Sequence, residues 1–458
     1  MDRSEAMQDQ KIGSLLFSFS LPAIIGMLVN SLYNIVDRIF VGRGVGAMAI
    51  AATTVAFPIM IILMAVSVLI GIGATALISI RLGEQKKEEA EKVAGNAMAM
   101  LILLPAILTV FVLLFTEPIL SVFGASPAVF PYAKDFVHII MLGSVFGSIS
   151  MGMNNFIRAE GNPKMAMSTQ IIGAVINGIL NYIFIFKLGM GIKGSALSTV
   201  IAQFISAAWV LSYFFIGRSL VKIRLKNLKL QGPVLVSIMT IGFAPFAMQV
   251  ANSIQQLILN KTLMFYSGDL ALSAVGIMLS ISTLLFMPIL GLSQGAQPII
   301  GYNYGAQQFD RVKETFKKAA IAGTCIALIG YLMISIWPSQ IVGLFSKGDT
   351  ELTTLTIHAM HVYLALFPVV GFQIIGSHYF QAVGKAVQSA ILSLSRQLLL
   401  FIPLLLILPR FWGAEGVWMT APLADLLSVM LTASFVYFEL KKLGKDVQAP
   451  KSDPILSE

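Results

Sequence analysis

The stretch IMIILMAVSVLIGIGATALISI, residues 59–80, has no charged side chain and is long enough to cross a bilayer as an α-helix. Similar runs occupy residues 98–115 and 319–337. Hydrophobic residues make up 57% of the 458-residue chain and charged residues 12%, about half the share that is usual in a soluble domain. The chain is therefore predicted to be an all-α integral membrane protein. A β-barrel is excluded because the apolar runs are continuous rather than alternating.

Apolar runs recur along the whole chain, separated by short polar segments. A helical crossing needs about 20 residues, and several runs exceed that length, so we expect those helices to tilt or to project beyond the bilayer. We predict twelve transmembrane helices, near residues 13–40, 48–80, 93–115, 131–158, 164–188, 192–217, 234–266, 270–303, 314–337, 353–382, 386–409 and 413–440.

The net charge of +9 raises the question of a nucleic-acid partner, and the distribution of the charge answers it. With the N-terminus inside, most Lys and Arg residues fall in segments on the cytoplasmic side, as the positive-inside rule describes. The pattern therefore predicts that both termini are cytoplasmic and that nucleic acid is not a partner. Cys325 is the only cysteine, so a disulfide or a thiolate metal site within one chain is excluded.

The second half of the chain repeats the landmarks of the first at a constant offset of 222 or 223 residues. Because each copy holds an even number of spans, the two copies have the same orientation in the membrane. We predict two pseudo-symmetric six-helix lobes joined by a basic amphipathic linker. The paired landmarks are Pro22 and Pro245, Gly73 and Gly295, Gly83 and Gly305, Gly161 and Gly384, and Gly191 and Gly413. The predicted division is an N-terminal lobe (1–217), a cytoplasmic linker (218–233), a C-terminal lobe (234–442) and a cytoplasmic tail (443–458).

Duplicated helical bundles of this kind are typical of secondary transporters, which bind substrate between their halves near mid-bilayer and alternate by rocking. A channel or receptor is the alternative from another class, but a selectivity filter needs a ring of carbonyls or charges, and no filter-like sequence is present. The chain has no P-loop, HExxH or GxSxG motif. We therefore predict a transporter, not an enzyme, that has no cofactor and is driven by an ion gradient.

One acid, Asp37, lies inside the first apolar span. Inserting a carboxylate into hydrocarbon costs roughly 2.5–3.5 kcal/mol, so such a residue indicates a functional site. Polar residues at spacings of three and four share its helical face, and the fifth and sixth spans add amides and a hydroxyl. Oxygens of this kind can coordinate a small hard cation or surround a proton-binding carboxylate. The predicted ion-coupling residues are Tyr33, Asn34, Asp37, Asn177, Asn181 and Thr199, with H⁺ or Na⁺ as the coupling ion and Na⁺ at Asp37 as the one metal ion considered.

The repeat provides an internal control for this cluster. At the offset of 223 residues the second half has Asn260 in place of Asp37, and the two amides of the fifth span become Leu400 and Leu404. Polar residues often only join helices in membranes. Because the second lobe is expected to fold without these amides, we favour a functional role over a packing role.

Other residues are predicted to shape or gate the transport path. Pro22 lacks an N–H and permits a kink in the first span, so that helix is hypothesised to bend with the state of Asp37. The turn at 158–164 reverses tightly, and its Arg158 and Glu160 are interpreted as a gate or a lobe brace. Arg396 and Asp425 lie equally far from the turn between the last two spans and are predicted to form an ion pair or shared polar network. The predicted cavity lining, which includes adaptable Met and Phe side chains, is Asn30, Met153, Asn154, Gln256, Phe286 and Met287.

At these residues the sequence resembles the multidrug and toxic compound extrusion (MATE) family over essentially the whole chain, in particular its bacterial MepA-like and DinF-like branches. The resemblance rests on Pro22, on Tyr33-Asn-Ile-Val-Asp37 followed by Val41-Gly42, on Arg158-Ala-Glu-Gly-Asn-Pro163, on Asn177, on Gly191-x-x-Gly194 with Thr199, and on Gln294-Gly295-Ala296-Gln297-Pro298. It implies twelve helices in two lobes and export of cationic, often aromatic drugs by antiport against protons or sodium.

The resemblance also implies roles for single residues. Asp37 matches the coupling acid of the family's first helix, Tyr33 its phenolic neighbour, Asn177 the amide of the fifth helix and Thr199 the hydroxyl of the sixth. Many relatives have Asp where this chain has Asn181, which leaves one negative charge and favours a proton or a looser cation site. The second-lobe acids that some members use for coupling have no evident counterpart in this chain, unless Asp425 serves in that role.

Together these observations predict an ion-coupled antiporter that exports amphipathic cationic drugs or toxic compounds by alternating access. A flippase of lipid-linked or glycoconjugate substrates shares the architecture and is the alternative within transport. We expect a monomer in the bacterial plasma membrane, with small organic cations and membrane lipid, but no obligate protein, as partners.

Overall fold

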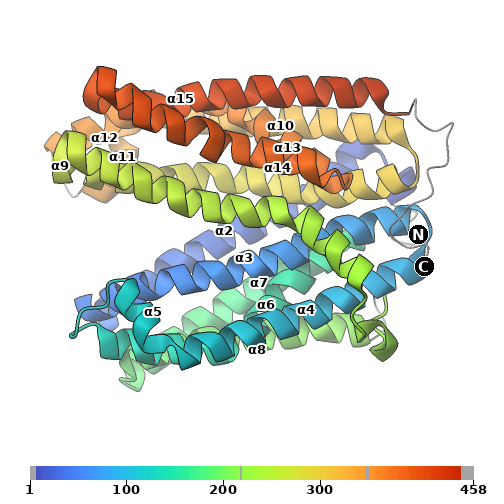
Figure 1. Ribbon diagram of the computed structural model, residues 1–458, viewed down its shortest axis with the longest axis horizontal. Coiled ribbons are helices and arrows are strands. Elements are labelled where there is room, and N and C mark those ends of the chain that lie inside the picture. The colour runs from blue at the N-terminus through green and yellow to red at the C-terminus, as the bar shows by residue number, and fades with distance from the viewer. Residues whose placement is uncertain (1–6, 217–218, 347–349, 445–458) are drawn as a thin grey trace. The chain divides into compact units, whose positions relative to one another are not determined.

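The computed structural model describes residues 7–216, 219–346 and 350–444, and every regular element in that part of the chain is helical (Figure 1). The predicted tail from residue 445 onward and Arg218 of the predicted linker lie outside the described residues. The elements, in chain order, are α2 (Ile12–Gly44), α3 (Ala47–Gly83), α4 (Lys87–Leu114), α5 (Thr116–Val122), α6 (Phe130–Ala159), α7 (Pro163–Asn181), η1 (Tyr182–Lys187), α8 (Gly191–Phe215), η2 (Leu225–Leu228), α9 (Gly232–Gly305), α10 (Phe309–Ile336), α11 (Pro338–Ser346), α12 (Thr350–Tyr363), α13 (Phe367–Ala382), α14 (Ala386–Leu394), η3 (Ser395–Phe401) and α15 (Ile402–Lys442).

Ten helices in the described residues are long and apolar enough to span a membrane, or eleven when α12 and α13, bent by 51°, are counted as one broken span. Twelve spans were predicted from the sequence. The difference lies in residues 386–442, which count as one candidate of 57 residues. At 1.5 Å per residue such a helix is more than twice as long as a bilayer is thick. It breaks at Gly413, whose φ of 54° is non-helical, so the two last predicted spans meet there.

The long helix α9 contains two candidate spans, Gly232–Tyr266 and Ser273–Gly305, which agree with the predicted spans 234–266 and 270–303. Two short helices that were not predicted, α5 and α11, follow α4 and α10 directly. Each begins at a residue, Thr116 or Pro338, that is compatible with the first turn of a helix.

The chain divides into two compact units. One consists mainly of Ile25–Gly242, and the other of Gln10–Ile24 and the described residues from Phe243 onward. The first half of α2 therefore belongs to the second unit, and the first residues of α9 belong to the first unit. Both division points lie within three residues of the paired prolines Pro22 and Pro245. A segment is therefore exchanged between the units at the same place in both copies of the repeat.

Glycines make these exchanged segments fit. In the first unit, a Cβ on Gly73 of α3 would lie 2.1 Å from the carbonyl oxygen of Ile238 in α9. In the second unit, a Cβ on Gly295 of α9 would lie 2.6 Å from the Cα of Ser20 in α2. Small residues allow helix backbones to approach this closely in membranes. The repeated Gly73 and Gly295 therefore have the same packing role in both units.

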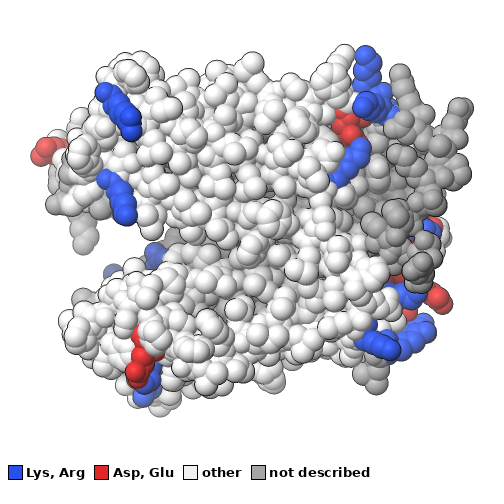
Figure 2. Space-filling model, viewed as in Figure 1, with Lys and Arg blue, Asp and Glu red and all other residues white. Residues whose placement is uncertain are grey.

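Each unit has its own apolar core. In the first unit the core joins α3, α6 and α8 around residues such as Ile140 and Ala196, and in the second it joins α9, α12, α13 and α15 around Phe367 and Trp418. On the face shown in Figure 2, Lys, Arg, Asp and Glu gather toward the two ends, and the middle of each unit is free of charged side chains. Large apolar side chains along the helices, such as Ile107 of α4 and Leu328 of α10, are instead exposed, as in a protein whose helices face lipid.

Candidate functional site

The candidate site lies within the first unit, where α2, α7 and α8 bring polar side chains together. Asn177 and Asn181 are one helical turn apart on α7 and are both buried. Thr199 of α8 is also buried, and Asp37 of α2 is half-buried. The three helices thus place one carboxylate and several neutral oxygens in a common interior position.

A continuous chain of hydrogen bonds links these side chains. The Nδ2 of Asn181 donates to Asp37 Oδ1 at 2.6 Å and to Asn177 Oδ1 at 2.8 Å. Asn177 Nδ2 donates in turn to Thr199 Oγ1 at 3.1 Å, and Ser198 Oγ donates to Asn181 Oδ1 at 2.8 Å. A change at Asp37 therefore reaches both amides and both hydroxyls of α8.

Two more hydroxyls complete the surroundings of the carboxylate. Tyr33, one turn before Asp37, interacts with the side chain of Thr199. Ser195 lies close to Asp37, but its Oγ is buried and has no hydrogen-bond partner among the described residues. An orphaned buried hydroxyl is unusual in a folded protein and is a free oxygen ligand beside the acid.

The helix that holds both amides is irregular directly after them. From Tyr182 to Lys187 the backbone continues as a π-helix, η1. Single π-helical turns inside α-helices are frequent at functional sites. The irregular turn begins at the residue after Asn181, the amide that contacts Asp37.

This arrangement can hold one small monovalent cation or one proton. Asp37 is the single acid in the cluster, and no group of three or more His, Cys, Asp or Glu residues suited to a metal ion occurs in the part of the chain described. Carboxylate, amide and hydroxyl oxygens suit hard cations, and a lone carboxylate neutralises one positive charge.

Two predicted members of the polar face do not join the cluster. Asn34 Nδ2 donates to the carbonyl oxygen and to the Oδ1 of Asn30, at 2.8 and 3.0 Å. Both asparagines are exposed and bond along α2 rather than toward α7. Asn34 lies three residues before Asp37, but its side-chain amide bonds to Asn30 in the preceding turn of α2 and not to Asp37.

The predicted cavity residues fall into two groups. Met153 and Asn154 are buried in the first unit, and Asn154 Oδ1 has no hydrogen-bond partner among the described residues. Gln256 is exposed, and Phe286 and Met287 are half-buried in the second unit. The last three therefore keep surface that a ligand could contact.

Glu160, predicted as a gate or brace, holds the segment that follows α8. Its carboxylate accepts hydrogen bonds from Tyr213 Oη at 2.9 Å and Ser219 Oγ at 2.5 Å, and from the backbone N–H groups of Leu220 and Val221 at 3.0 and 3.2 Å. Burial raises the pKa of Glu160 to about 7, although these hydrogen bonds act to lower it. Arg158, beside it, donates to the Oδ1 of Asn155.

Two further residues, which sequence reasoning missed, fix the same segment. Glu91 pairs with Arg224 at 3.0 Å, and Asn96 accepts from the backbone N–H of Gln231 at 2.7 Å. Both come from α4 and are buried. Polar residues at the start of an otherwise apolar span were the sequence signal that could have revealed them. The segment 219–231 is thereby attached to the first unit.

The remaining predicted gating residues lie in the second unit. Pro22 is inside α2, between Ser20 and Ile24, which pack closely against α9. The predicted pairing of the last two spans is confirmed, because Arg396 Nε lies 2.6 Å from Asp425 Oδ1. Arg396 is the second residue of the other π-helical segment, η3.

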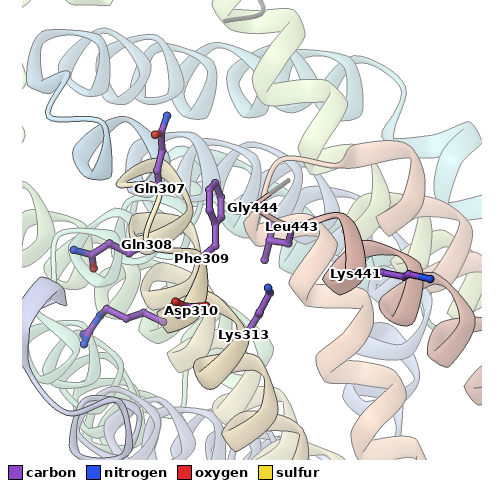
Figure 3. Close-up of a pocket in the computed structure, with 9 residues that line it drawn as sticks. Gln307, Gln308, Phe309, Asp310, Lys313, Lys441, Leu443 and Gly444 are labelled. Carbon is purple, nitrogen blue, oxygen red and sulfur yellow. The ribbon is translucent and has the colours of Figure 1, made fainter. Parts of the chain in front are cut away.

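One cavity of about 620 Å³ lies at the start of α10 and the end of α15 (Figure 3). Gln308, Asp310 and Lys313 come from the α10 side, and Lys441 and Leu443 from the α15 side. The cavity belongs to the second unit, whereas the Asp37 cluster belongs to the first. It therefore contributes nothing to the candidate site.

Repeated bundles of helices that are long and apolar enough to span a membrane define the class of multi-pass membrane transporters. The chain belongs to the MatE family, whose model matches residues 22–183 and 245–407, and it is therefore a transporter and not an enzyme. The two matches begin at Pro22 and Pro245, the first landmarks of the repeat.

Curated relatives and solved structures agree with this assignment. The chain is 27% identical to the multidrug export protein MepA of Staphylococcus haemolyticus (strain JCSC1435), over 96% of both chains. It is 26% identical to MepA of Staphylococcus aureus (strain N315), over 94% of this chain and 95% of the relative. It is 37% identical to the MATE multidrug transporter DinF-BH, solved in complex with rhodamine 6G, with a TM-score of 0.87 over 94% of this chain and 97% of that chain. A MATE crystal structure in the bent conformation, 23% identical, has a TM-score of 0.91 over 97% and 99% of the two chains.

Proposed function

We propose that this transporter exports amphipathic cations in exchange for an ion, H⁺ or Na⁺, that binds at Asp37. The observation that carries the proposal is the contact between Asp37 and Asn181, which links the single acid of the cluster to the amides of α7 and the hydroxyls of α8. A packing role alone does not require an ionisable group, since the repeat has Asn260 at the corresponding position.

Exchange follows from the chemistry of a lone carboxylate. Inside hydrocarbon an ionised Asp37 is costly, so it favours a bound proton, a bound sodium ion or a nearby cationic substrate. Each of these neutralises the same charge, and they therefore compete. A carboxylate that releases its ion on one side of the membrane and accepts substrate in its place couples the gradient to export.

The ligand set bears on which ion is used. A proton needs only the carboxylate and hydrogen-bond donors such as Asn181 Nδ2. Sodium needs several oxygens, which Asn177 Oδ1, Ser195 Oγ and Thr199 Oγ1 offer nearby. With one negative charge in the cluster we infer that the proton is the main coupling ion.

The substrate class rests on the relatives. MepA proteins are multidrug export proteins, and DinF-BH is a multidrug transporter solved with rhodamine 6G. We transfer this class to the present chain and propose amphipathic, drug-sized organic cations as substrates. We further propose that the transporter is a monomer in the bacterial plasma membrane with both termini in the cytoplasm, which the distribution of Lys and Arg supports.

Transport into vesicles tests the proposal. The full chain is reconstituted in proteoliposomes, and uptake of rhodamine 6G is followed under an imposed proton or sodium gradient. We expect gradient-driven uptake by the natural protein and its loss in Asp37→Asn. The matched control is Asn260→Ala, which changes the corresponding residue of the repeat and is expected to keep the coupling. Gradient-driven uptake by Asp37→Asn at the natural rate would refute the assignment of the site.

A further inference from the structure

A basic segment, residues 219–231, follows α8 and is called the linker segment below. It contains Lys222, Arg224, Lys226 and Lys229 and no Asp or Glu. All four basic side chains are exposed. An excess of Lys and Arg on the cytoplasmic side is general in membrane proteins, so the charge alone does not identify a partner. The contacts that hold the segment on the first unit give this charge a fixed place.

Two buried side chains of α4 fix the backbone of the linker segment. The carboxylate of Glu91 accepts a hydrogen bond from the backbone N–H of Lys222 at 3.4 Å and pairs with Arg224 at 3.0 Å. The Nδ2 of Asn96 donates to the carbonyl oxygen of Asn227 at 3.2 Å. Buried polar groups that are satisfied in this way stabilise one arrangement of the chain. The lysines of the segment therefore have defined positions on the first unit.

These contacts also fix the depth of the linker segment in the membrane. A Cβ on Gly95 of α4 would lie 2.5 Å from the carbonyl oxygen of Asn227, so the two backbones touch. The apolar run of α4 begins at Val93, between the contact residues Glu91 and Asn96. A spanning helix passes from the headgroups into hydrocarbon where its apolar run begins. The linker segment therefore lies at the level of the lipid headgroups.

The lysines of the linker segment lie on its exposed side. Val221 is buried, whereas Lys222, Lys226 and Lys229 are exposed. Within the part of the chain that the structure describes, the ammonium groups of these three lysines form no hydrogen bond or ion pair, in contrast to Arg224. The segment thus presents three cations at the headgroup level that no described acid neutralises.

Apolar side chains flank these cations. Phe215 and Ile216, shortly before the linker segment, and Leu230, near its end, are exposed. Exposed apolar residues beside lysines are typical of a segment in the membrane interface, where the apolar side chains enter the acyl boundary and the ammonium groups meet phosphates. Anionic phospholipid is the partner that fits, because the negative surface of the cytoplasmic leaflet attracts basic segments next to membrane spans.

We propose that Lys222, Lys226 and Lys229 bind the phosphate groups of anionic phospholipids, such as phosphatidylglycerol, in the cytoplasmic leaflet. Glu91 and Asn96 position these lysines by holding the linker segment at the headgroups. The bound lipid stabilises the protein, because it binds a surface that only the folded chain presents. The inference uses the proposed orientation in the membrane and depends on neither the coupling ion nor the exported substrate.

A lipid titration of the purified full chain tests the inference. Phosphatidylglycerol is added to the detergent-solubilised protein, and its apparent dissociation constant is taken from the rise in unfolding temperature. We expect Lys222→Gln/Lys226→Gln/Lys229→Gln to weaken binding about tenfold or more, because each lysine near an anionic surface contributes a factor of roughly five. Phosphatidylcholine, which carries no net charge, should not distinguish this variant from the natural protein.

The matched control is Lys317→Gln/Lys441→Gln/Lys442→Gln. It removes the same charge from exposed positions on α10 and α15 of the second unit, and we expect it to keep the natural affinity for phosphatidylglycerol. Equal losses in the two glutamine variants, or natural affinity in the linker variant, would overturn the inference.

A charge-conserving variant separates the loss of charge from damage to the fold. Lys222→Arg/Lys226→Arg/Lys229→Arg changes the same three side chains and retains every positive charge, so it should bind phosphatidylglycerol as the natural protein does. A tenfold loss in this variant would show that the charge is not what binds the lipid.

Free phosphate is the other source of the same chemical group. Inorganic phosphate at the concentration of the lipid phosphate should leave the unfolding temperature unchanged, because it lacks the acyl chains that hold a headgroup at the membrane surface. An equal rise with inorganic phosphate would show that the site binds soluble anions, and the lipid assignment would be wrong. The titration uses neither a gradient nor an exported substrate, so its failure and a failure of the export proposal are separate results.

Discussion

Asp37 and Asn181 form the contact on which the account of this transporter depends. Asn181 Nδ2 lies 2.6 Å from Asp37 Oδ1, and Asn181 also bonds to Asn177 and Ser198. These hydrogen bonds connect the carboxylate of α2 to side chains of α7 and α8. The sequence predicted Asp37 with both amides and Thr199, because a lone acid and amides at helical spacing are visible in one dimension. It missed Ser195 and Ser198, although Ser195 lies three residues before Ser198 and four before Thr199, a helical spacing that was a usable signal.

The identity of residue 181 should set the choice of ion. Asn181→Asp places a second carboxylate against Asp37, and two carboxylates in contact repel unless a cation or a shared proton lies between them. One more unit charge at about 4 Å is worth ~1–4 kcal/mol, so we expect sodium to be bound roughly tenfold more tightly or better. The sodium concentration that gives half-maximal exchange measures this. Asn260→Asp adds the same charge in the second unit and should not change it; equal sodium dependence in both variants would contradict the prediction.

Glu160 should make the stability of the first unit depend on pH. Its pKa in the folded protein is raised from 4.5 to about 7, chiefly by burial. The stabilising contribution is therefore complete below about pH 4.5 and is lost as the pH rises to about 7, an effect of about 3 kcal/mol. Thermal unfolding of the detergent-solubilised protein across this range measures it. Glu160→Gln should remove the dependence, and the exposed Glu88→Gln should keep it. A Glu160→Gln variant with the natural pH profile would show that the group does not titrate there.

Among the elements, the membrane helices were predictable and their irregularities were not. Continuous apolar runs located the spans because a helix that faces lipid must satisfy its backbone internally. The π-helical segments η1 and η3 left no such trace, because one extra residue in a turn is set by tertiary contacts rather than by periodicity.

Helix packing at the repeated glycines makes a prediction at this scale. A Cβ at Gly73 would meet the carbonyl oxygen of Ile238 at 2.1 Å, a distance that forces the helices apart. We expect Gly73→Ala to destabilise the protein by about 1–3 kcal/mol, as overpacking does. Gly276→Ala, at a helical glycine with no atom within 4 Å, is the control and should be neutral or slightly stabilising. Thermal unfolding that ranks the two variants the other way would contradict this packing.

At the scale of the whole molecule, duplication explains most of what the sequence revealed. The constant offset predicted two related halves, and the family model matches each of them separately. The sequence did not reveal that Gln10–Ile24 and the first residues of α9 are exchanged between the units. That exchange depends on close backbone contacts at Gly73, Gly242, Gly291 and Gly295, which glycine identity alone does not specify.

Duplication also identifies the functional additions. A shared scaffold supplies packing, so a charged residue present in only one copy, such as Asp37 in the first, supports a functional role. On this account Asp37 exchanges its ion for substrate.

The most direct measurement of this claim is the equilibrium binding of rhodamine 6G to the purified protein over a range of pH, with and without sodium. The natural protein should lose affinity for the dye as protons or sodium ions occupy Asp37, and in Asp37→Asn the affinity should be independent of both. If Asp37→Asn retains the pH and sodium dependence of the natural protein, the ion binds elsewhere and the account is contradicted.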